Sequence, residues 1–203
     1  MIQSTPLVAD GDAIAVFEIA SIARGVVVLD QMAKRAFTEI ISSKTVSPGK
    51  YLIILSGTVA EIEEASFAAL ESMQDDQIDH IILRDPHPLL RKTFANELEP
   101  NFRESISICE FLTLSSTIHA LDVILKSSGV EVIELRLGAG LDGKGIFTVT
   151  GSLDTIEAAC DLIESNVDHT KIHRIEKIAQ IHEDLPKHLL GAELPASRGT
   201  PSK

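Results

Sequence analysis

The apolar positions along the chain follow one order of elements, which then recurs. Residues 12–20 (DAIAVFEIA) alternate with a β-branched and aromatic bias, which predicts a strand. Apolar residues then fall at helical spacing through residues 21–37 (SIARGVVVLDQMAKRAF), and Ser21 is placed to cap this predicted helix. The chain therefore opens with a strand and a helix of about four turns.

Three further elements complete this first unit. Residues 38–46 (TEIISSKTV) and 50–57 (KYLIILSG) predict two strands joined by an SPG turn. Residues 58–73 (TVAEIEEASFAALESM) predict a helix that begins with Thr58, with Glu61 in capping-box position. Residues 77–85 (QIDHIILRD) predict a fourth strand.

The second half of the chain repeats this pattern. Matched pairs at a separation of 92 are Glu18 and Glu110, Asp30 and Asp122, and Lys34 and Lys126. After an insertion of two residues, the pairs Gly49 and Gly143, Lys50 and Lys144, and Gly57 and Gly151 are separated by 94. A tandem duplication explains these constant offsets.

The order of elements predicts an α+β fold, a tandem duplication of a ferredoxin-like β-α-β-β-α-β domain. Each domain is expected to hold an antiparallel sheet with both helices on one face. We expect an N-terminal tail at 1–12, a first domain at 13–88, a linker at 89–104, a second domain at 105–189 and a flexible C-terminal tail at 190–203. The linker is polar and bracketed by prolines, with room for a short helix.

The formal net charge of −12 argues against nucleic-acid and anionic-membrane partners, because such binding draws on Lys and Arg. No apolar run reaches the roughly 18 residues that span a bilayer. The N-terminus lacks the features of a secretion signal, so we expect a cytoplasmic protein. The two cysteines, Cys109 and Cys160, are too few for a disulfide framework or a metal cage and are expected to be buried thiols.

Catalytic and metal motifs are weak. Residues 138–145 (GAGLDGKG) nearly match a phosphate-binding loop, but Gly145 stands where a hydroxyl is needed and a strand follows in place of a helix. His169 and His173 lack metal-ligand partners at suitable spacing and are expected to be solvated. The matched Glu18 and Glu110 are better explained by a repeated structural role than by acid–base chemistry. We expect no enzyme activity.

The matched features resemble a known family. The glycine turns and following helices, SPGKYLIILSGTVAEIEEA and DGKGIFTVTGSLDTIEAA, together with the helix Lys at 34 and 126, resemble the shell proteins of bacterial microcompartments. The resemblance is to their tandem-domain, trimer-forming, non-permuted class, and it covers about residues 13–181. The helix of the second copy, LSSTIHALDVILKSSG, lacks the small residues usual in the family.

The resemblance implies a homotrimer of six domains around a central axis, tiling edge to edge with other shell proteins in the bacterial cytoplasm. Small metabolites would pass through a central pore. By resemblance the pore is lined by Ser47, Pro48, Gly49, Leu141, Asp142 and Gly143. The inter-disc edge would carry Lys34, Lys126, Arg84 and His87, although the matching segment of the second copy, IHEDLPKH, preserves this edge motif poorly.

The resemblance also raises the question of a cofactor. Some members of the class hold an iron–sulfur cluster on the axis through one Cys per chain in the first-copy turn. This sequence has Ser47 there, and a hydroxyl is a poor ligand for iron–sulfur clusters. We therefore expect no cluster and no metal. Asp142 would disfavour anions in the pore, whereas Lys50 and Lys144 either offset its charge or point away along their strands.

A second function stays open at this level. Tandem ferredoxin-like domains also serve as regulatory proteins that bind small ligands between domains, and fold alone does not separate the two functions. The recurrence of the helix Lys and the glycine turn in both copies favours a ring over a single pocket.

Overall fold

The computed structural model describes residues 12–95, 97–98, 101–138 and 140–189. The predicted C-terminal tail at 190–203 and all but Asp12 of the predicted N-terminal tail lie outside the described residues.

The two repeats have the same order of elements. The first contains β1 (Ala13–Ile19), α1 (Ile22–Arg35), β2 (Glu39–Val46), β3 (Lys50–Gly57), α2 (Val59–Met73), the 3₁₀ turn η1 (Gln74–Asp76) and β4 (Gln77–Arg84). The helix α3 (Pro88–Phe94) follows. The second repeat contains β5 (Ser105–Phe111), α4 (Leu114–Ser127), β6 (Glu131–Leu137), β7 (Gly145–Gly151), α5 (Leu153–Asn166), η2 (His169–Lys171) and β8 (Ile172–Ile178), before α6 (Pro186–Leu189).

Each repeat forms a four-stranded antiparallel sheet. The strand orders are β2-β3-β1-β4 and β6-β7-β5-β8, which are the same arrangement in sequence-equivalent strands. The predicted duplication of a β-α-β-β-α-β unit is confirmed.

Helices α1, α2, α4 and α5 begin where the sequence pattern predicts them, each after a capping residue. The Ser21 hydroxyl accepts a hydrogen bond from the Arg24 amide, so it caps α1. Thr58 and Glu61 form a complete capping box at α2. Thr113 and Ser152 cap α4 and α5 in the second repeat. These caps satisfy amides that a helix leaves unpaired in its first turn.

The structure reveals a third offset between the repeats. Glu18 pairs across the sheet with Asp79, and Glu110 pairs with Arg174, so the last strands match at a separation of 95. The register shifts directly after Glu18 and after Glu110 in both repeats. The extra residue precedes the 3₁₀ turn, where the two copies share no sequence signal.

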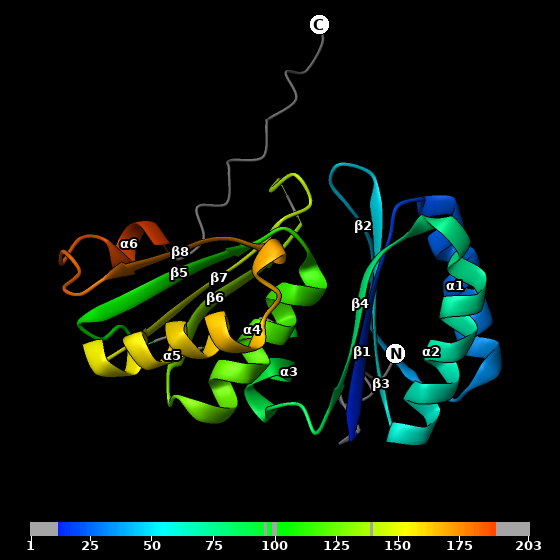
Figure 1. Cartoon of the computed structure of the whole chain (residues 1–203), viewed down its shortest axis with the longest axis horizontal. Helices are drawn as coiled ribbons and strands as arrows, with labels where there is room; N and C mark the ends of the chain where they lie inside the picture. The colour runs from blue at the N-terminus through cyan, green and yellow to red at the C-terminus, as the bar shows by residue number, and fades with distance from the viewer. Residues whose placement is uncertain (1–11, 96, 99–100, 139, 190–203) are drawn as a thin grey trace, which may run out of the picture.

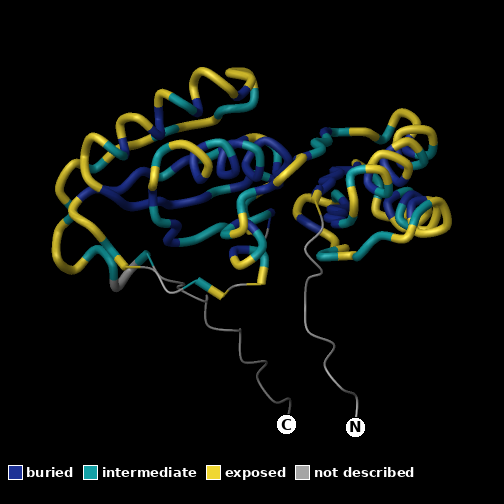
Figure 2. The backbone as a smooth tube through the Cα atoms, turned by 90° about the horizontal axis from the view of Figure 1, so that it is seen from below, coloured by how far each residue is buried: buried dark blue, intermediate teal, exposed yellow. Residues whose placement is uncertain are grey.

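The first sheet is covered on both faces. Its own helices α1 and α2 pack on one face around Phe17, Met32 and Ile62. The helix α4 of the second repeat packs on the other, in a core that joins Val16 and Ile54 to the second repeat. Figure 1 shows the first sheet edge-on between α1 and α2 on one side and α3 and α4 on the other. Figure 2 shows buried residues in the interior of both repeats and exposed residues along their outer segments.

The predicted linker takes part in this core. Pro88 begins α3, and Leu90 on this helix is fully buried. The helix α3 contacts α4 and β6, so it packs on the second repeat. Only two of its side chains are buried, which is why a window of polar composition did not predict it as part of the core.

Gly25 sets how closely α1 approaches its sheet. A Cβ at this position would lie 2.5 Å from Tyr51 side-chain atoms. We expect Gly25→Ala to lower the free energy of unfolding by about 1–3 kcal/mol through overpacking, although alanine favours helices by about 1 kcal/mol over glycine. Urea unfolding at fixed protein concentration measures this change.

Ala33 provides the matched control, because it is exposed on the same helix. Ala33→Gly should cost about 1 kcal/mol from helix propensity alone. A Gly25→Ala protein that is as stable as the wild type, or more stable, would show that Tyr51 does not limit the approach of α1.

Candidate functional site at the contact between the repeats

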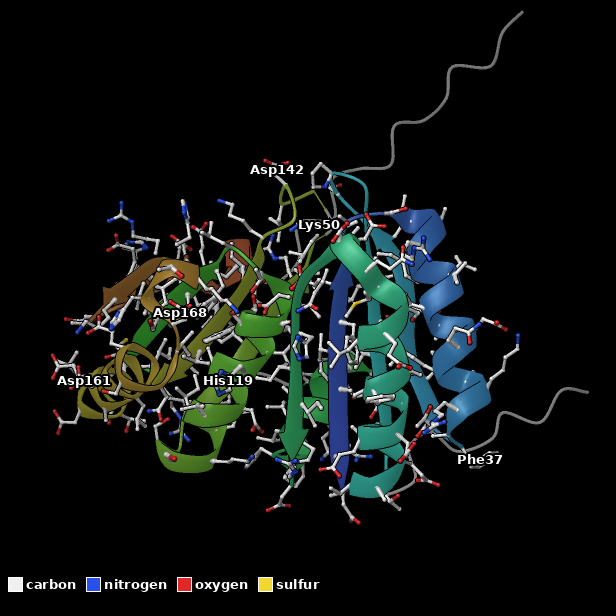
Figure 3. The ribbon with its side chains drawn as sticks, turned by 45° about the vertical axis from the view of Figure 1, so that its right-hand side comes forward. Phe37, Lys50, His119, Asp142, Asp161 and Asp168 are labelled. Atoms are coloured by element: carbon white, nitrogen blue, oxygen red, sulfur yellow. The ribbon has the colours of Figure 1, made fainter. Side chains whose placement is uncertain are left out.

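The two hairpin loops that the sequence singles out lie side by side. The Lys50 ammonium donates a hydrogen bond to the Gly143 carbonyl at 3.4 Å. A Cβ on Gly143 would lie only 3.0 Å from the Ser47 carbonyl oxygen. Figure 1 shows both loops at the same end of the molecule, and Figure 3 labels Asp142 and Lys50 at that end. The contact between the repeats therefore brings the predicted pore segments together.

The loops expose a short run of polar backbone. Ser47, Pro48, Gly49 and Asp142 are exposed, whereas Leu141 is half-buried and Gly143 is buried. The positive φ of Gly143 and its close approach to Ser47 both require glycine. That these residues line a pore stays a prediction.

The glycine-rich stretch is a hairpin loop and not a phosphate-binding loop. The Gly138 amide donates to the Lys144 carbonyl at 3.1 Å, which closes the loop. The strand β7 begins at Gly145, so the loop does not lead into a helix as a phosphate-binding loop does. The prediction that this motif does not bind nucleotide phosphates is consistent with this geometry.

The lysines after each glycine pair with glutamates in the neighbouring strand. Lys50 lies 3.7 Å from Glu18, and Lys144 lies 3.1 Å from Glu110. Both lysines thus lie close to the matched glutamates, and Lys50 also reaches the loop through its hydrogen bond to the Gly143 carbonyl. Whether their charges offset Asp142 in a pore stays open.

Glu18 fixes the first sheet to the helix of the second repeat. Its carboxylate is fully buried and accepts a hydrogen bond of 2.8 Å from the Ser115 amide in the first turn of α4. A helix N-terminus favours a negative charge. Burial raises the pKa of Glu18, while the Ser115 hydrogen bond and the Lys50 charge act in the opposite direction. The matched glutamate therefore has a structural role, as predicted.

Asp79 makes the second polar contact between the repeats. Its carboxylate accepts hydrogen bonds from Lys171 at 2.7 Å and Thr113 at 2.6 Å. Burial works to raise the pKa of Asp79, but the hydrogen bonds from Lys171 and Thr113, with the Lys171 charge, lower it overall. Asp79 and Lys171 thus form a charged pair that joins β4 to η2.

Two of the predicted edge residues are exposed. Lys34 lies 2.6 Å from Asp30 one turn earlier on α1. Arg84 lies 2.6 Å from Glu63 on α2. Both pairs are on the surface of the first repeat, where ion pairs contribute little stability.

The other two predicted edge residues belong to the contact between the repeats. Asp122 is almost fully buried and accepts hydrogen bonds from the Lys126 ammonium at 2.6 Å and the His87 amide at 2.7 Å. The matched lysines at 34 and 126 therefore have different surroundings in one chain. Their role at an edge between discs stays a prediction.

The residues present do not fit an iron–sulfur cluster. Cys109 and Cys160 are buried in the second repeat, where both thiols lie 3.4 Å from the Ser107 hydroxyl. Burial raises the pKa of Cys109 to about 12, which keeps the thiol protonated. Ser47 offers a hydroxyl at the loop. Within the described residues no group of three or more His, Cys, Asp or Glu side chains could hold a metal ion.

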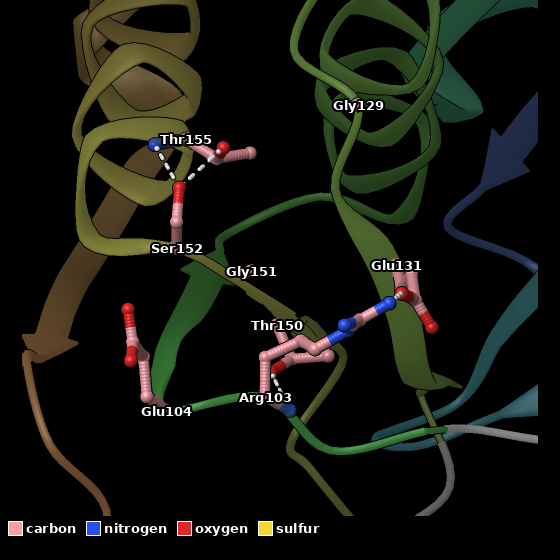
Figure 4. Close-up of a pocket in the computed structure, with 8 residues that line it drawn as sticks. All are labelled: Arg103, Glu104, Gly129, Glu131, Thr150, Gly151, Ser152 and Thr155. Atoms are coloured by element: carbon pink, nitrogen blue, oxygen red, sulfur yellow. Dashed lines mark hydrogen bonds and ion pairs between the residues drawn. The ribbon is translucent and has the colours of Figure 1, made fainter.

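The described residues line several hollows. One, of about 380 Å³, lies beside Arg103, which bonds to Glu131 and Thr150 (Figure 4). Another, of about 180 Å³, lies beside Asp79 and Lys171. A third, of about 240 Å³, lies between Ile54 of the first repeat and Leu135 of the second. The polar groups named for the first two hollows bond to one another.

No pattern in the sequence marks Asp79 and Lys171. They lie 92 positions apart in sequence and in elements that the repeat match does not pair with each other. A signal was available for Glu18 alone, since it is the one charged residue in an otherwise apolar strand and recurs as Glu110.

Comparisons with known proteins agree with the fold. The sequence model of the BMC domain matches residues 13–86 and 105–180. The chain is 28% identical to the bacterial microcompartment shell protein PduT of Citrobacter freundii over 147 residues, which is 72% of this chain and 80% of that protein. In the described part of the chain, no helix is long and apolar enough to span a membrane.

Solved structures show the same tandem arrangement. A microcompartment protein from Desulfitobacterium hafniense, 27% identical, covers 86% of this chain and 98% of its own with a TM-score of 0.77. A double-ringed trimeric shell protein from the RMM microcompartment, 16% identical, matches in fold with a TM-score of 0.59 over 76% of this chain and 82% of its own. The chain belongs to the BMC domain family, with two copies of the domain.

The raised pKa of Glu18 predicts a pH dependence of stability. The folded chain holds this proton more tightly than the unfolded chain, so the contribution of Glu18 to the free energy of unfolding should fall as pH rises from 4.5 through the raised value. Burial lowers the pKa of His119, which acts in the opposite direction below 6.5, in the wild type and in a Glu18 variant alike. Glu18→Gln keeps an acceptor for the Ser115 amide without the charge, so its stability should fall less over this range. Urea unfolding at several pH values from 4.5 to neutrality tests this.

Two features keep this test specific. Glu157→Gln, on the exposed surface of α5, should leave the slope unchanged. The pKa of Asp79 is lowered, so its contribution to stability is lost only as pH falls below its ordinary pKa of 3.8. This pH range does not overlap with that of the Glu18 test. An equal slope in the wild type and Glu18→Gln would contradict the prediction.

Proposed function

We propose that this protein is a structural shell protein of a bacterial microcompartment in the bacterial cytoplasm. Three chains close into a pseudo-hexameric ring of six domains, and rings tile edge to edge with other shell proteins. The tandem BMC domains and the likeness to PduT support the shell role and disfavour the regulatory alternative. Shell proteins of this kind are structural, and we propose no catalytic activity.

The observation that carries the proposal is the head-to-tail contact between the repeats. The strand face of the first sheet receives α4 of the second repeat, so two different surfaces meet. A contact of this kind generates a ring when its rotation closes. The same contact sets the two hairpin loops side by side at one end.

We further propose that the loops face the ring axis and line a pore for small metabolites. Ser47, Pro48, Gly49, Leu141, Asp142 and Gly143 would surround the opening. Three copies of Asp142 would make it unfavourable for anions, because the charges of Lys50 and Lys144 are paired with Glu18 and Glu110.

Light scattering combined with negative-stain electron microscopy tests the ring. The expected mass is near three times that of the chain, with hexagonal discs and sheets of discs. Lys34→Ala should keep the discs and lose the sheets, because Lys34 would contact a neighbouring disc. Lys44→Ala, an exposed lysine outside the predicted edge, is the control. A monomer or dimer without discs would overturn the proposal.

Cross-linking tests the position of the loops. In Asp142→Cys, three thiols would surround the axis, so a short bismaleimide should yield covalent dimers on a denaturing gel. The buried Cys109 and Cys160 should not react. Asp154→Cys, exposed at the start of α5, is the control and should yield none. An intact trimer whose Asp142→Cys chains do not cross-link would place the loops away from the axis.

A further inference from the structure

The chain buries one face of α4 and leaves the equivalent face of α1 exposed. Leu114 and Ile118 on α4 are both 0% exposed, because they pack on the first sheet. Their equivalents on α1, Ile22 and Val26, are 40% and 53% exposed. Exposed apolar side chains grouped on one helix are typical of an interaction surface.

The sheets show the same asymmetry. Val16 and Glu18 on β1 are fully buried beneath α4. Their equivalents on β5, Ile108 and Glu110, are partly exposed. One chain thus carries a bare helix face on its first repeat and a bare sheet face on its second, which are the two halves of the contact already formed inside the chain.

The charged pair inside the chain has a reversed equivalent on the bare surfaces. Asp79 on β4 matches Arg174 on β8, because Glu18 and Glu110 lie opposite them in the same register. Lys171 matches Asp76, since their carbonyls accept equivalent hydrogen bonds from the amides of residues 112 and 20 at 2.9 and 2.8 Å. Inside the chain, the acidic residue of the pair lies on the sheet and the basic residue lies on the 3₁₀ turn. On the bare surfaces, the basic residue lies on the sheet and the acidic residue lies on the turn.

We propose that α1 and η1 of one chain dock on the open face of the second sheet of another copy, with Arg174 of one chain paired to Asp76 of the next. This proposal rests on the proposed ring and assigns its contact between chains. The Glu110 carboxylate then accepts a hydrogen bond from the amide of Ala23 at the start of α1, as the Glu18 carboxylate accepts one from the amide of Ser115. The exposed Ile22 and Val26 of α1 meet Ile108 on the sheet in the same contact.

The reversed charges agree with the order of domains that the covered surfaces impose. The first sheet and α4 already cover each other inside the chain, so only the second sheet and α1 are left for a neighbouring chain. If the first sheet received η1, Asp79 would face Asp76. If the second sheet received η2, Arg174 would face Lys171. Like charges thus disfavour both wrong contacts, and the two pairs reinforce a ring in which first and second domains alternate.

The present contacts of Arg174 and Asp76 are weak. Arg174 lies 3.7 Å from Glu176, and both side chains are about two-thirds exposed. Asp76 lies 3.8 Å from Arg24 and is 39% exposed. Exposed pairs of this length contribute little, so their rearrangement costs little. Arg24 occupies the position of Ser116, whose hydroxyl donates to Asp79 inside the chain. In the docked contact Arg24 therefore also lies near Arg174, and Asp76 offsets both guanidinium charges.

Charge exchange tests the pair. In the trimer of the full chain, Arg174→Glu and Asp76→Lys should each raise the protein concentration at half-dissociation by about tenfold or more. The double variant should return to near the wild-type value, because it restores opposite charges. Light scattering across a dilution series measures the change, and circular dichroism confirms that each chain is folded.

Matched controls make the same charge changes next to the proposed contact. Lys177→Glu lies on the same strand, opposite Ser107 and thus on the other face. Asp75→Lys lies in the same 3₁₀ turn. Both should dissociate like the wild type. Single variants that also match the wild type, or a double variant no better than the singles, would overturn the pair.

A second measurement is independent of charge. Asp76→Cys combined with Arg174→Cys should give covalent trimers with a short bismaleimide, whereas each single variant should give only monomers. A wild-type monomer would refute the ring itself. A wild-type trimer in which the double-cysteine chain remains uncross-linked would refute only this contact and leave the ring in place.

Discussion

The packing of α4 against the open face of the first sheet is the constraint on which the rest of the molecule depends. Each domain has helices on one face of its sheet, and the other face of the first sheet carries Ile14, Val16, Leu52 and Ile54. Exposed, this face would be a large apolar patch. The second repeat buries it, so the position of the second domain follows from the hydrophobic effect.

Apolar packing alone would leave the angle of α4 loosely defined, and the buried polar groups fix it. Glu18 must meet the Ser115 amide and Asp79 must meet Lys171, since an unpaired buried carboxylate costs far more than a misplaced methyl group. Satisfying both contacts at once leaves little freedom of rotation. The hairpin loops, at the end of the same strands, are then held in contact through Lys50 and Gly143.

The sequence was sufficient for what depends on neighbouring residues. The strands, the helices with their Ser21 and Thr58 caps, and the duplication follow from local pattern and from matched positions. The third offset between the repeats did not follow from the sequence, because η1 and η2 share no residues that reveal it. The burial of Leu90 and the pairing of Asp79 with Lys171 also escaped prediction, since both depend on which surfaces the fold brings together and not on the local pattern.

Duplication makes this use of charge possible. A ring of six identical single-domain chains has one kind of contact, so any charged pair must repeat at every joint and cannot distinguish one neighbour from another. A tandem chain has two kinds of contact and can vary them separately. Here Glu18 receives the N-terminus of α4 and Glu110 is the same residue type at the equivalent position, whereas the residues at the flanking turn and strand have opposite signs. In the proposed ring, both glutamates form joints and the reversed charges reinforce the order of the domains.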